Sequence, residues 1–328
     1  MKKSKVTVAV VQAAPELFDT QSAVDIIERM ARSAAAQGAQ LVVFPEVFIP
    51  GYPRGLSFGA RVGSRTAGGR SDWERYWASS IDVPGEETAR FGELARELGV
   101  YMVIGAVERD QQFSAGTLYN TMLYIGPDGS LIGKHRKLVP TGSERLLWGQ
   151  GDGSTLTAVQ TPFGRIGGLI CWENYMPLAR TAIYAQGIDI YIAPTADARD
   201  TWQATIRHIA CEGRCYVLSC NQYATKASYP ADLSGYDEIG ADSDPLCRGG
   251  SAIVGPLGDY IAGPLYGEEG MLVATLDLSL IAQSRFDFDV VGHYSRPDIF
   301  QLRVNDRRHE IVSRTSETFA TTGEQKRG

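Results

Sequence analysis

The stretch RIGGLICWENYMPLARTAIYAQGIDIYIA, residues 165–193, decides the fold. Residues 165–171 have the apolar character of a buried strand, and a helix pattern follows over residues 177–186. A second apolar strand is expected over residues 189–193. A strand, a helix and another strand in succession indicate a layered α/β domain.

The same alternation extends through most of the chain. Helix patterns over residues 22–37 and 86–98 end at Gly38 and Gly99, and glycine is favoured just past the end of a helix. The other expected strands cover residues 5–12, 41–44, 100–107, 118–125, 131–138, 215–221, 251–254 and 271–276, and a further helix covers residues 202–212. No linker-like shift in composition occurs, so we expect one domain over residues 1–304 and a polar, mobile tail over residues 305–328. Two segments, 54–75 and 223–248, are expected to be long loops.

Composition excludes several classes of protein. The chain has 328 residues, of which 44% are apolar and 21% are charged, as in ordinary globular proteins. Its 32 basic and 38 acidic residues give a net charge of −6, which argues against a nucleic-acid partner. No apolar run approaches the ~20 residues that cross a bilayer, and residues 6–14 are too short and strand-like for a signal sequence. We therefore expect a soluble, cytoplasmic protein without a membrane partner.

Cysteine and histidine are too few and too scattered for two familiar kinds of site. The five cysteines have an odd count and irregular spacing, so no disulfide framework is expected. Only four histidines occur, and none belongs to an HExxH motif. The nearest metal candidate is His208 with Cys211 and Cys215, although cysteines packed on a helix explain this spacing better. We expect neither a metal nor a cofactor.

Three expected strands each end in one reactive side chain. The strands that begin at residues 41, 131 and 166 lead to Glu46, Lys137 and Cys171. Sites collect at strand ends in open α/β sheets, so these side chains are expected to meet. Together they form a nucleophilic site without histidine: the carboxylate takes the thiol proton, the ammonium stabilises negative charge and the sulfur attacks. Taken singly, each has a structural explanation, as a buried turn, a solvated basic strand or a core thiol.

Longer strings around these residues resemble the three catalytic motifs of the nitrilase superfamily. The strings are FPEVFIPGYPR (44–54), GKHRKLVPTGSERLLWGQGDGS (133–154) and GGLICWENYMPLAR (167–180). They are most similar to the nitrilase branch, with its plant-type enzymes and their bacterial relatives. A late string, FDFDVVGHYSRPDIF (286–300), resembles the C-terminal signature of the same branch. The resemblance covers residues 6–302, nearly the whole chain.

The resemblance implies a fold and an activity. The expected fold is a four-layer α-β-β-α sandwich, and the expected assembly is a homodimer that extends into larger spirals or filaments. The implied reaction converts a small-molecule nitrile to the carboxylic acid and ammonia through a covalent thioimidate and thioester. In it Glu46 is the general base, Lys137 stabilises charge and Cys171 is the nucleophile. Glu144 maps onto a second family glutamate with a supporting role, and a purely structural ion pair with Lys137 is its alternative.

Five residues near the strand ends are expected to line the substrate pocket: Tyr52, Trp172, Tyr175, Thr195 and Ala196. The backbone N–H of Trp172 is a further candidate to stabilise charge. His135 lies two residues before Lys137 on a strand, shares its face and is expected to support it. His293 is expected to anchor the C-terminal segment at an interface. Surface or oligomer-contact charges are expected at Arg54, Arg61, Arg65 and Arg70, with anion binding as the alternative.

Other functions stay open at this level. The same three catalytic groups attack an amide carbon equally well, so an amidase or carbamoyl hydrolase is the nearest alternative. A Cys–His hydrolase needs an imidazole beside Cys171, and no histidine lies in an obvious partner position. A non-catalytic, filament-forming protein with this fold is disfavoured because all three catalytic residue types are present.

Overall fold

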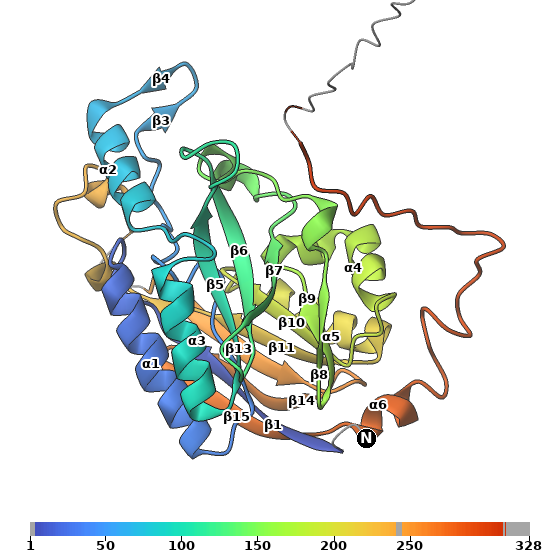
Figure 1. Ribbon diagram of the computed structural model, residues 1–328. Helices are drawn as coiled ribbons and strands as arrows, with labels where there is room; N and C mark the ends of the chain where they lie inside the picture. Colours follow the sequence, from blue (N-terminus) through green and yellow to red (C-terminus); the bar gives the residue numbers. More distant parts are fainter. Residues whose placement is uncertain (1–3, 241–244, 311, 313–328) are drawn as a thin grey trace, which may run out of the picture.

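The computed structural model describes residues 4–240, 245–310 and 312, and two large sheets form its centre (Figure 1). The first sheet has six strands in the order β15-β1-β2-β5-β6-β7. Strands β1, β2 and β5 run parallel, and β15, β6 and β7 pair antiparallel to their neighbours. Their bounds are β1 Lys5–Gln12, β2 Leu41–Val43, β5 Tyr101–Arg109, β6 Leu118–Ile125, β7 Leu131–Arg136 and β15 Gly270–Asp277.

The second sheet has seven strands, with β12-β13-β11-β10-β9-β8 in order and β14 paired to β13. Its parallel centre is β9, β10 and β11. The bounds are β8 Ala158–Thr161, β9 Gly164–Gly168, β10 Ile190–Thr195, β11 Tyr216–Asn221, β12 Tyr223–Ala224, β13 Cys247–Val254 and β14 Tyr260–Tyr266. The sequence did not predict β8, β12 or β14 as strands.

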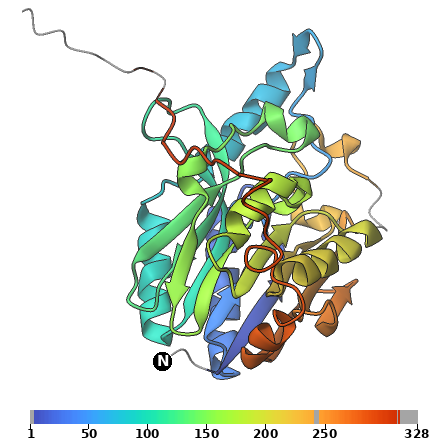
Figure 2. The ribbon, with the colours of Figure 1, turned by 90° about the vertical axis from the view of Figure 1, so that its right-hand side faces the viewer.

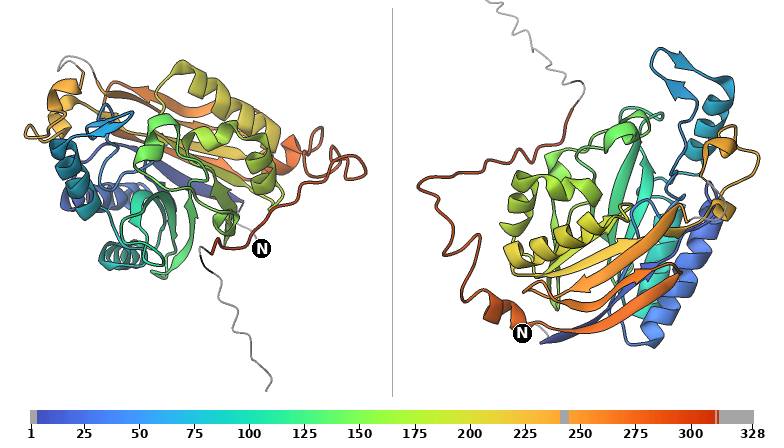
Figure 3. Two further views of the ribbon diagram at one scale, coloured as in Figure 1. Left: turned by 90° about the horizontal axis from the view of Figure 1, so that it is seen from above. Right: turned by 180° about the vertical axis from the view of Figure 1, so that it is seen from behind.

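Helices cover the outer face of each sheet, as the view from above shows (Figure 3). Helices α1 (Thr20–Ala36) and α3 (Glu86–Leu98) lie on the first sheet. Helices α4 (Pro177–Tyr184) and α5 (Asp200–Gly213) lie on the second. The helix that was expected to end before Gly99 does so, and Gly99 adopts the left-handed conformation that glycine favours.

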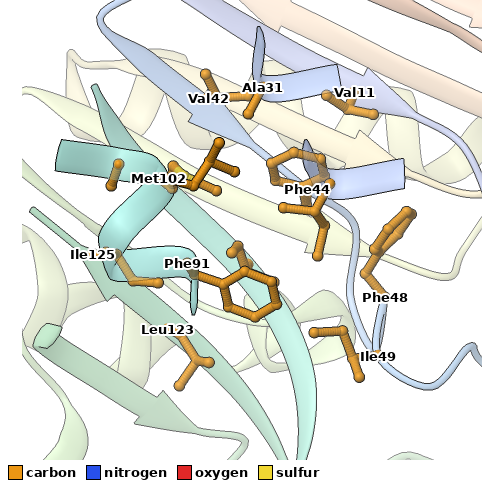
Figure 4. Packing of buried hydrophobic residues seen from close by; sticks show 14 of the residues in the cluster. Val11, Ala31, Val42, Phe44, Phe48, Ile49, Phe91, Met102, Leu123 and Ile125 are labelled. Carbon is orange, nitrogen blue, oxygen red and sulfur yellow. The ribbon is translucent and has the colours of Figure 1, made fainter. Parts of the chain in front are cut away.

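Three apolar clusters fill the spaces between these layers. One joins α1 and α3 to the first sheet through residues such as Ala31, Phe91 and Met102 (Figure 4). A second lies between the two sheets, and a third joins α4 and α5 to the second sheet. Alternate side chains of each strand point to opposite faces, so both faces of both sheets are buried. The layer order is therefore α-β-β-α, and the predicted four-layer sandwich is confirmed.

The prediction of a long loop over residues 54–75 is wrong. This segment contains the hairpin β3–β4 (Ala60–Arg61 and Ser64–Arg65) and the start of helix α2 (Ala67–Ala78), which project from the body (Figure 1). Thr66 caps the helix by accepting a hydrogen bond from the Gly69 N–H at 3.1 Å. Position 69 needs a glycine because the helix packs closely against the main chain of Phe58. A Cβ atom at this position would lie 2.1 Å from the Phe58 carbonyl oxygen. Glycines that serve packing were mistaken for loop residues.

The segment 223–248 begins with the short strand β12 and ends in the first residues of β13, and its described part between them is irregular apart from short 3-10 turns, as expected of a loop. After the short helix α6 (Ser279–Ser284), the chain runs without helix or strand to residue 310 along the outside of the body (Figure 2). Most of the predicted tail, 311 and 313–328, lies outside the described residues. Among the described residues, no helix has both the length and the apolar character needed to cross a membrane.

Candidate active site

Four predicted catalytic side chains meet where strands of the two sheets end. Glu46 lies three residues beyond β2, and Lys137 follows β7 directly. Glu144 lies in the 3-10 turn Gly142–Leu146, and Cys171 begins the 3-10 turn Cys171–Tyr175. The strand before Cys171 ends at Gly168, three residues earlier than the sequence predicted, because the chain turns to enter this 3-10 helix.

Glu46 is held by one of its oxygens and leaves the other without a partner. The side chain is 1% exposed. Its Oε1 accepts hydrogen bonds from Lys137 Nζ at 2.8 Å and from Asn120 Nδ2 at 2.7 Å. Its Oε2 is buried and has no hydrogen-bond partner among the described residues. Burial raises the pKa of Glu46, and the positive charge of Lys137 offsets part of that rise. The free oxygen can therefore accept a proton from a reacting group.

Lys137 lies between two carboxylates. Its Nζ donates to Glu46 Oε1 and to Glu144 Oε2, both at 2.8 Å. Burial opposes the positive charge, but the two carboxylates outweigh it and raise the pKa of the ammonium above its ordinary value. Glu144 is fixed in turn by the Thr141 N–H at 2.7 Å and by the Tyr52 hydroxyl at 2.5 Å. The ion pair considered for Glu144 is therefore present, and the two carboxylates favour the charged form of the buried ammonium beside the base.

Cys171 is held in an unusual backbone conformation. Its φ is +51°, in the left-handed region that non-glycine residues rarely occupy. Asn174 Nδ2 donates to the carbonyl oxygens of Leu169 and Cys171 at 2.9 and 2.8 Å, which ties down the turn. The Thr195 hydroxyl donates to Sγ at 3.1 Å. The backbone N–H of Trp172, at the start of the turn, has no acceptor among the described residues and is free for a ligand.

The nucleophile opens into a pocket of about 190 Å³. Three of the five predicted lining residues, Tyr52, Trp172 and Ala196, line it. Thr195 is fully buried beneath the sulfur instead. Tyr175 is 44% exposed and lies outside the pocket, its ring 5.7 Å from that of Trp172.

Arg54 also lines this pocket, so its assignment as a surface or oligomer-contact charge is wrong. The guanidinium lies over the ring of Tyr52 at 5.5 Å and donates to the Ala196 carbonyl oxygen. Its position after the tight turn of the first motif, GYPR, was the available signal. The other three loop arginines, Arg61, Arg65 and Arg70, are exposed as expected.

The sequence also missed Asn120 and misassigned His135. Asn120 is a buried polar residue in the apolar strand β6, and that contrast could have identified it. His135 does not support Lys137: its ring contacts the carboxylate of Glu173 at 3.0 Å. Lys137 lies just past the end of β7, where the alternation of faces no longer holds. His293 is exposed and packs against Tyr294.

No three His, Cys, Asp or Glu side chains gather as metal ligands in the described part of the chain. The considered cluster of His208, Cys211 and Cys215 is therefore not assembled. His208 lies 3.7 Å from Glu212, one turn further along α5.

The Cys171 thiol is expected to be protonated in the free protein at neutral pH. Burial raises its pKa to about 12, the charge of Glu46 adds to this, and Lys137 and Thr195 offset only part. Lys137 therefore offsets the rise in the thiol pKa only in part, and Cys171 needs a base at the moment of attack. The difference in absorbance at 240 nm between the wild-type protein and a Cys171→Ala variant should show no thiolate at pH 8. A thiolate that titrates below pH 7 would contradict this.

The chain is similar in sequence to known enzymes of one family. The family model for carbon–nitrogen hydrolases matches residues 7–286. An aliphatic nitrilase of Sinorhizobium fredii is 53% identical over 310 residues, covering 94% of this chain and 98% of its own. The bifunctional nitrilase/nitrile hydratase NIT4B of Nicotiana tabacum is 51% identical over 315 residues, covering 95% and 89%.

Two solved structures are similar at lower identity. The NitFhit protein of C. elegans has a TM-score of 0.71 at 22% identity, over 95% of this chain and 70% of that one. Nit3 of Saccharomyces cerevisiae has a TM-score of 0.69 at 23% identity, over 89% and 97%. At these identities the two structures support the fold alone.

Proposed function

The chain belongs to the carbon–nitrogen hydrolase family, and on this premise we propose that it hydrolyses an organic nitrile to the carboxylic acid and ammonia. Relatives about half identical over most of the chain are named nitrilases, which favours nitriles over amides as substrates. The observation that supports the mechanism is a linked cluster: Lys137 binds both Glu46 and Glu144, Glu144 lines the same pocket as Cys171, and one carboxylate oxygen of Glu46 is unoccupied.

In the first step Cys171 adds to the nitrile carbon. The thiol proton passes through Glu46 Oε2 to the nitrile nitrogen, so that deprotonation and attack occur together and no standing thiolate is needed. The product is a neutral thioimidate, with a new bond from carbon to sulfur and one carbon–nitrogen π bond lost. Lys137 and the free N–H of Trp172 stabilise negative charge that develops on nitrogen, a contribution of roughly 3–4 kcal/mol per donor in related sites.

Two water molecules complete the reaction. Glu46 takes a proton from the first water as its oxygen adds to the thioimidate carbon, and the protonated nitrogen leaves as ammonia. The resulting thioester is attacked by a second water in the same way, which releases the carboxylic acid and returns a proton to sulfur. Glu46 acts in the formation of the thioimidate and in both hydrolytic steps, so its Oε1 must stay fixed while Oε2 exchanges protons. Lys137 and Asn120 hold Oε1 in place through their hydrogen bonds.

Glu144 supports this exchange without contacting the nucleophile through any hydrogen bond among the described residues. It binds the second side of Lys137 and the hydroxyl of Tyr52, and burial raises the pKa of that hydroxyl well above its ordinary value. The tyrosine therefore stays a donor to Glu144, and Glu144 keeps Lys137 charged through both hydrolytic steps.

Ammonia release from a panel of nitriles, each measured beside its corresponding amide, tests the proposed reaction. We expect release from at least one nitrile at a rate well above that from its amide. Activity on amides alone would refute the proposal and favour the amidase alternative.

Turnover is expected to need no metal or cofactor. The proposal rests on side chains that together supply a base, a cation and a nucleophile. Prolonged treatment with EDTA or phenanthroline should leave the rate unchanged, whereas alkylation of thiols should abolish it. Activity lost to chelation and restored by Zn²⁺ would contradict this expectation.

Assembly, domain extent and compartment complete the proposal. The C-terminal segment exposes large apolar side chains, among them Phe286 at 89% and Phe300 at 77%, as suits a segment that a second copy covers in a homodimer or longer filament. Light scattering and electron microscopy test this assembly.

We propose one catalytic domain over residues 1–304 and a tail over residues 305–328. All five cysteines are free, which suits the cytoplasm.

A further inference from the structure

Glu173 is a buried carboxylate just behind the nucleophile, and none of the proposed chemical steps uses it. It lies two residues after Cys171 and is 1% exposed. Its Oε2 accepts a hydrogen bond from the Ile170 N–H at 2.8 Å, and its Oε1 accepts one from the Leu138 N–H at 2.6 Å. His135 Nε2 lies 3.0 and 3.2 Å from the two oxygens.

The two tethered N–H groups belong to the immediate chain neighbours of the catalytic residues. Ile170 precedes Cys171, in the chain leaving β9 of the second sheet. Leu138 follows Lys137, in the chain leaving β7 of the first sheet. A single carboxylate therefore joins the main chains that carry the nucleophile and the cation, from opposite sheets of the sandwich. The tethered Ile170 N–H also comes directly before Cys171, the residue with the positive φ.

We propose that Glu173 is a positioning residue that fixes Lys137 and Cys171 relative to each other, with His135 as its anchor. The inference rests on the proposed function, since it assigns Glu173 to the geometry of that same reaction.

His135 is suited to the anchoring role because both of its ring nitrogens face acceptors. Nδ1 lies 3.1 Å from the Thr155 carbonyl oxygen, and Nε2 faces the Glu173 carboxylate. A neutral imidazole can donate from one nitrogen only, so the full set of bonds requires imidazolium. Burial opposes that charge, but the charge of Glu173 outweighs it and raises the pKa of His135. The pair is therefore a buried ion pair, and burying two charges has a cost in stability. An apolar pair of the same size would avoid that cost, but it could not accept hydrogen bonds from the two main-chain N–H groups.

Only a carboxylate can make this connection. Each Glu173 oxygen accepts from a different main-chain N–H, so both ends of the group must be acceptors. In a Glu173→Gln variant one end becomes an NH₂ donor, which would face an N–H donor and release one of the two main chains. The variant keeps the size of the side chain while breaking the connection.

The expected effect of Glu173→Gln is on chemistry more than on substrate binding. A displacement of about 1 Å in a reacting group can cost about 10²-fold in rate, so kcat should fall by about that factor while KM stays within about threefold. The rate at which iodoacetamide labels Cys171, followed by peptide mass spectrometry, should fall at least about tenfold. Labelling of the partly exposed Cys211 on α5 should not change, which provides an internal control.

Asp72→Asn is the matched control. Asp72 is also a buried carboxylate, on α2, and it accepts from the distant Ser234 N–H at 3.1 Å, so Asp72→Asn makes the same change from carboxylate to amide at another long-range contact. That variant should lose stability but keep the labelling rate of Cys171. If Glu173→Gln labels Cys171 at the wild-type rate or faster, or loses kcat only in proportion to the unfolded fraction, the proposal is wrong.

His135→Gln covers the case in which Glu173→Gln does not fold. It leaves both main-chain tethers in place but removes the charged anchor, so kcat and the labelling rate of Cys171 should each fall several-fold, with KM unchanged. Wild-type values for both would overturn the anchoring role. Failure of the proposed function would be separate and visible in the wild-type protein, as absent ammonia release from nitriles or as turnover that survives complete labelling of Cys171.

Discussion

Glutamine at position 46 is expected to reduce nitrile turnover by about 10⁴-fold or more. A single general acid–base group contributes ~10²–10⁴-fold, and Glu46 would act in thiol activation and in both water attacks. The amide can still accept from Lys137 and Asn120, so the site should stay assembled, but no basic oxygen remains. Intact-mass measurement with excess nitrile should show very slow formation of any adduct on Cys171.

Glu144→Gln is the matched variant for this experiment. This variant changes the second carboxylate that binds Lys137. The Lys137 ammonium lies 2.8 Å from an oxygen of Glu144, the same distance as from Glu46. Acylation should proceed, but the later steps should slow, so the thioimidate or thioester accumulates on Cys171. If Glu46→Gln acylates at the wild-type rate while Glu144→Gln fails to acylate, the two roles are reversed.

Replacing Lys137 by methionine is the second change with a large expected effect. It leaves Glu46 and Glu144 buried without their shared cation, and breaking a buried ion pair typically costs about 3–5 kcal/mol of stability. One of the carboxylates would then bind a proton at neutral pH, so the base is lost together with the cation. We expect turnover to fall at least about 10³-fold.

The destabilisation of Lys137→Met should depend on pH. Without the cation, burial keeps the folded-state pKa of Glu46 above its unfolded value, so the folded state binds the extra proton. The stability that this proton contributes to the variant is therefore fully present below the ordinary glutamate pKa. It is lost as the pH rises through the raised folded-state pKa of Glu46. Urea unfolding should show a larger difference from wild type at pH 8 than at pH 5.

Lys134→Met provides the control for that variant. Lys134 lies three residues earlier on β7 and pairs with the buried Glu108 at 2.6 Å, which keeps Arg136 as a second partner. This variant should lose little turnover. Equal losses of turnover in Lys134→Met and Lys137→Met would indicate a general weakening of β7 instead of a specific role for Lys137.

Much of the site could be predicted from the sequence because its reactive residues follow strand ends in long, ordered motifs. Glu46, Lys137 and Cys171 each come within three residues of a strand, so their meeting followed from the α/β pattern. The contacts of Asn120 and Glu173 could not be predicted in the same way. Asn120 reaches a carboxylate 74 positions away and Glu173 an N–H 35 positions away, and no local pattern fixes such pairings.

The errors have physical causes of the same kind. Helix α2 was missed because Gly68 and Gly69 suggest a loop, although Gly69 is glycine only to let the helix approach Phe58. Arg54 was placed on the surface because it was grouped with the other arginines of an expected loop, although it closes the first catalytic motif and lines the pocket. His135 and Lys137 were expected to share one face of a strand. They do not, because β7 ends between them, at Arg136, and the alternation of faces stops there.

The central claim is that Cys171 attacks the nitrile. Its most direct test is peptide mass spectrometry of the protein after acid quench during turnover of a slow nitrile, with Glu144→Gln used to enrich the intermediate. We expect a thioimidate or thioester mass on the peptide that carries Cys171, and unmodified Cys211, Cys215, Cys220 and Cys247. A substrate-derived mass on any of those four, with Cys171 unmodified, would contradict it.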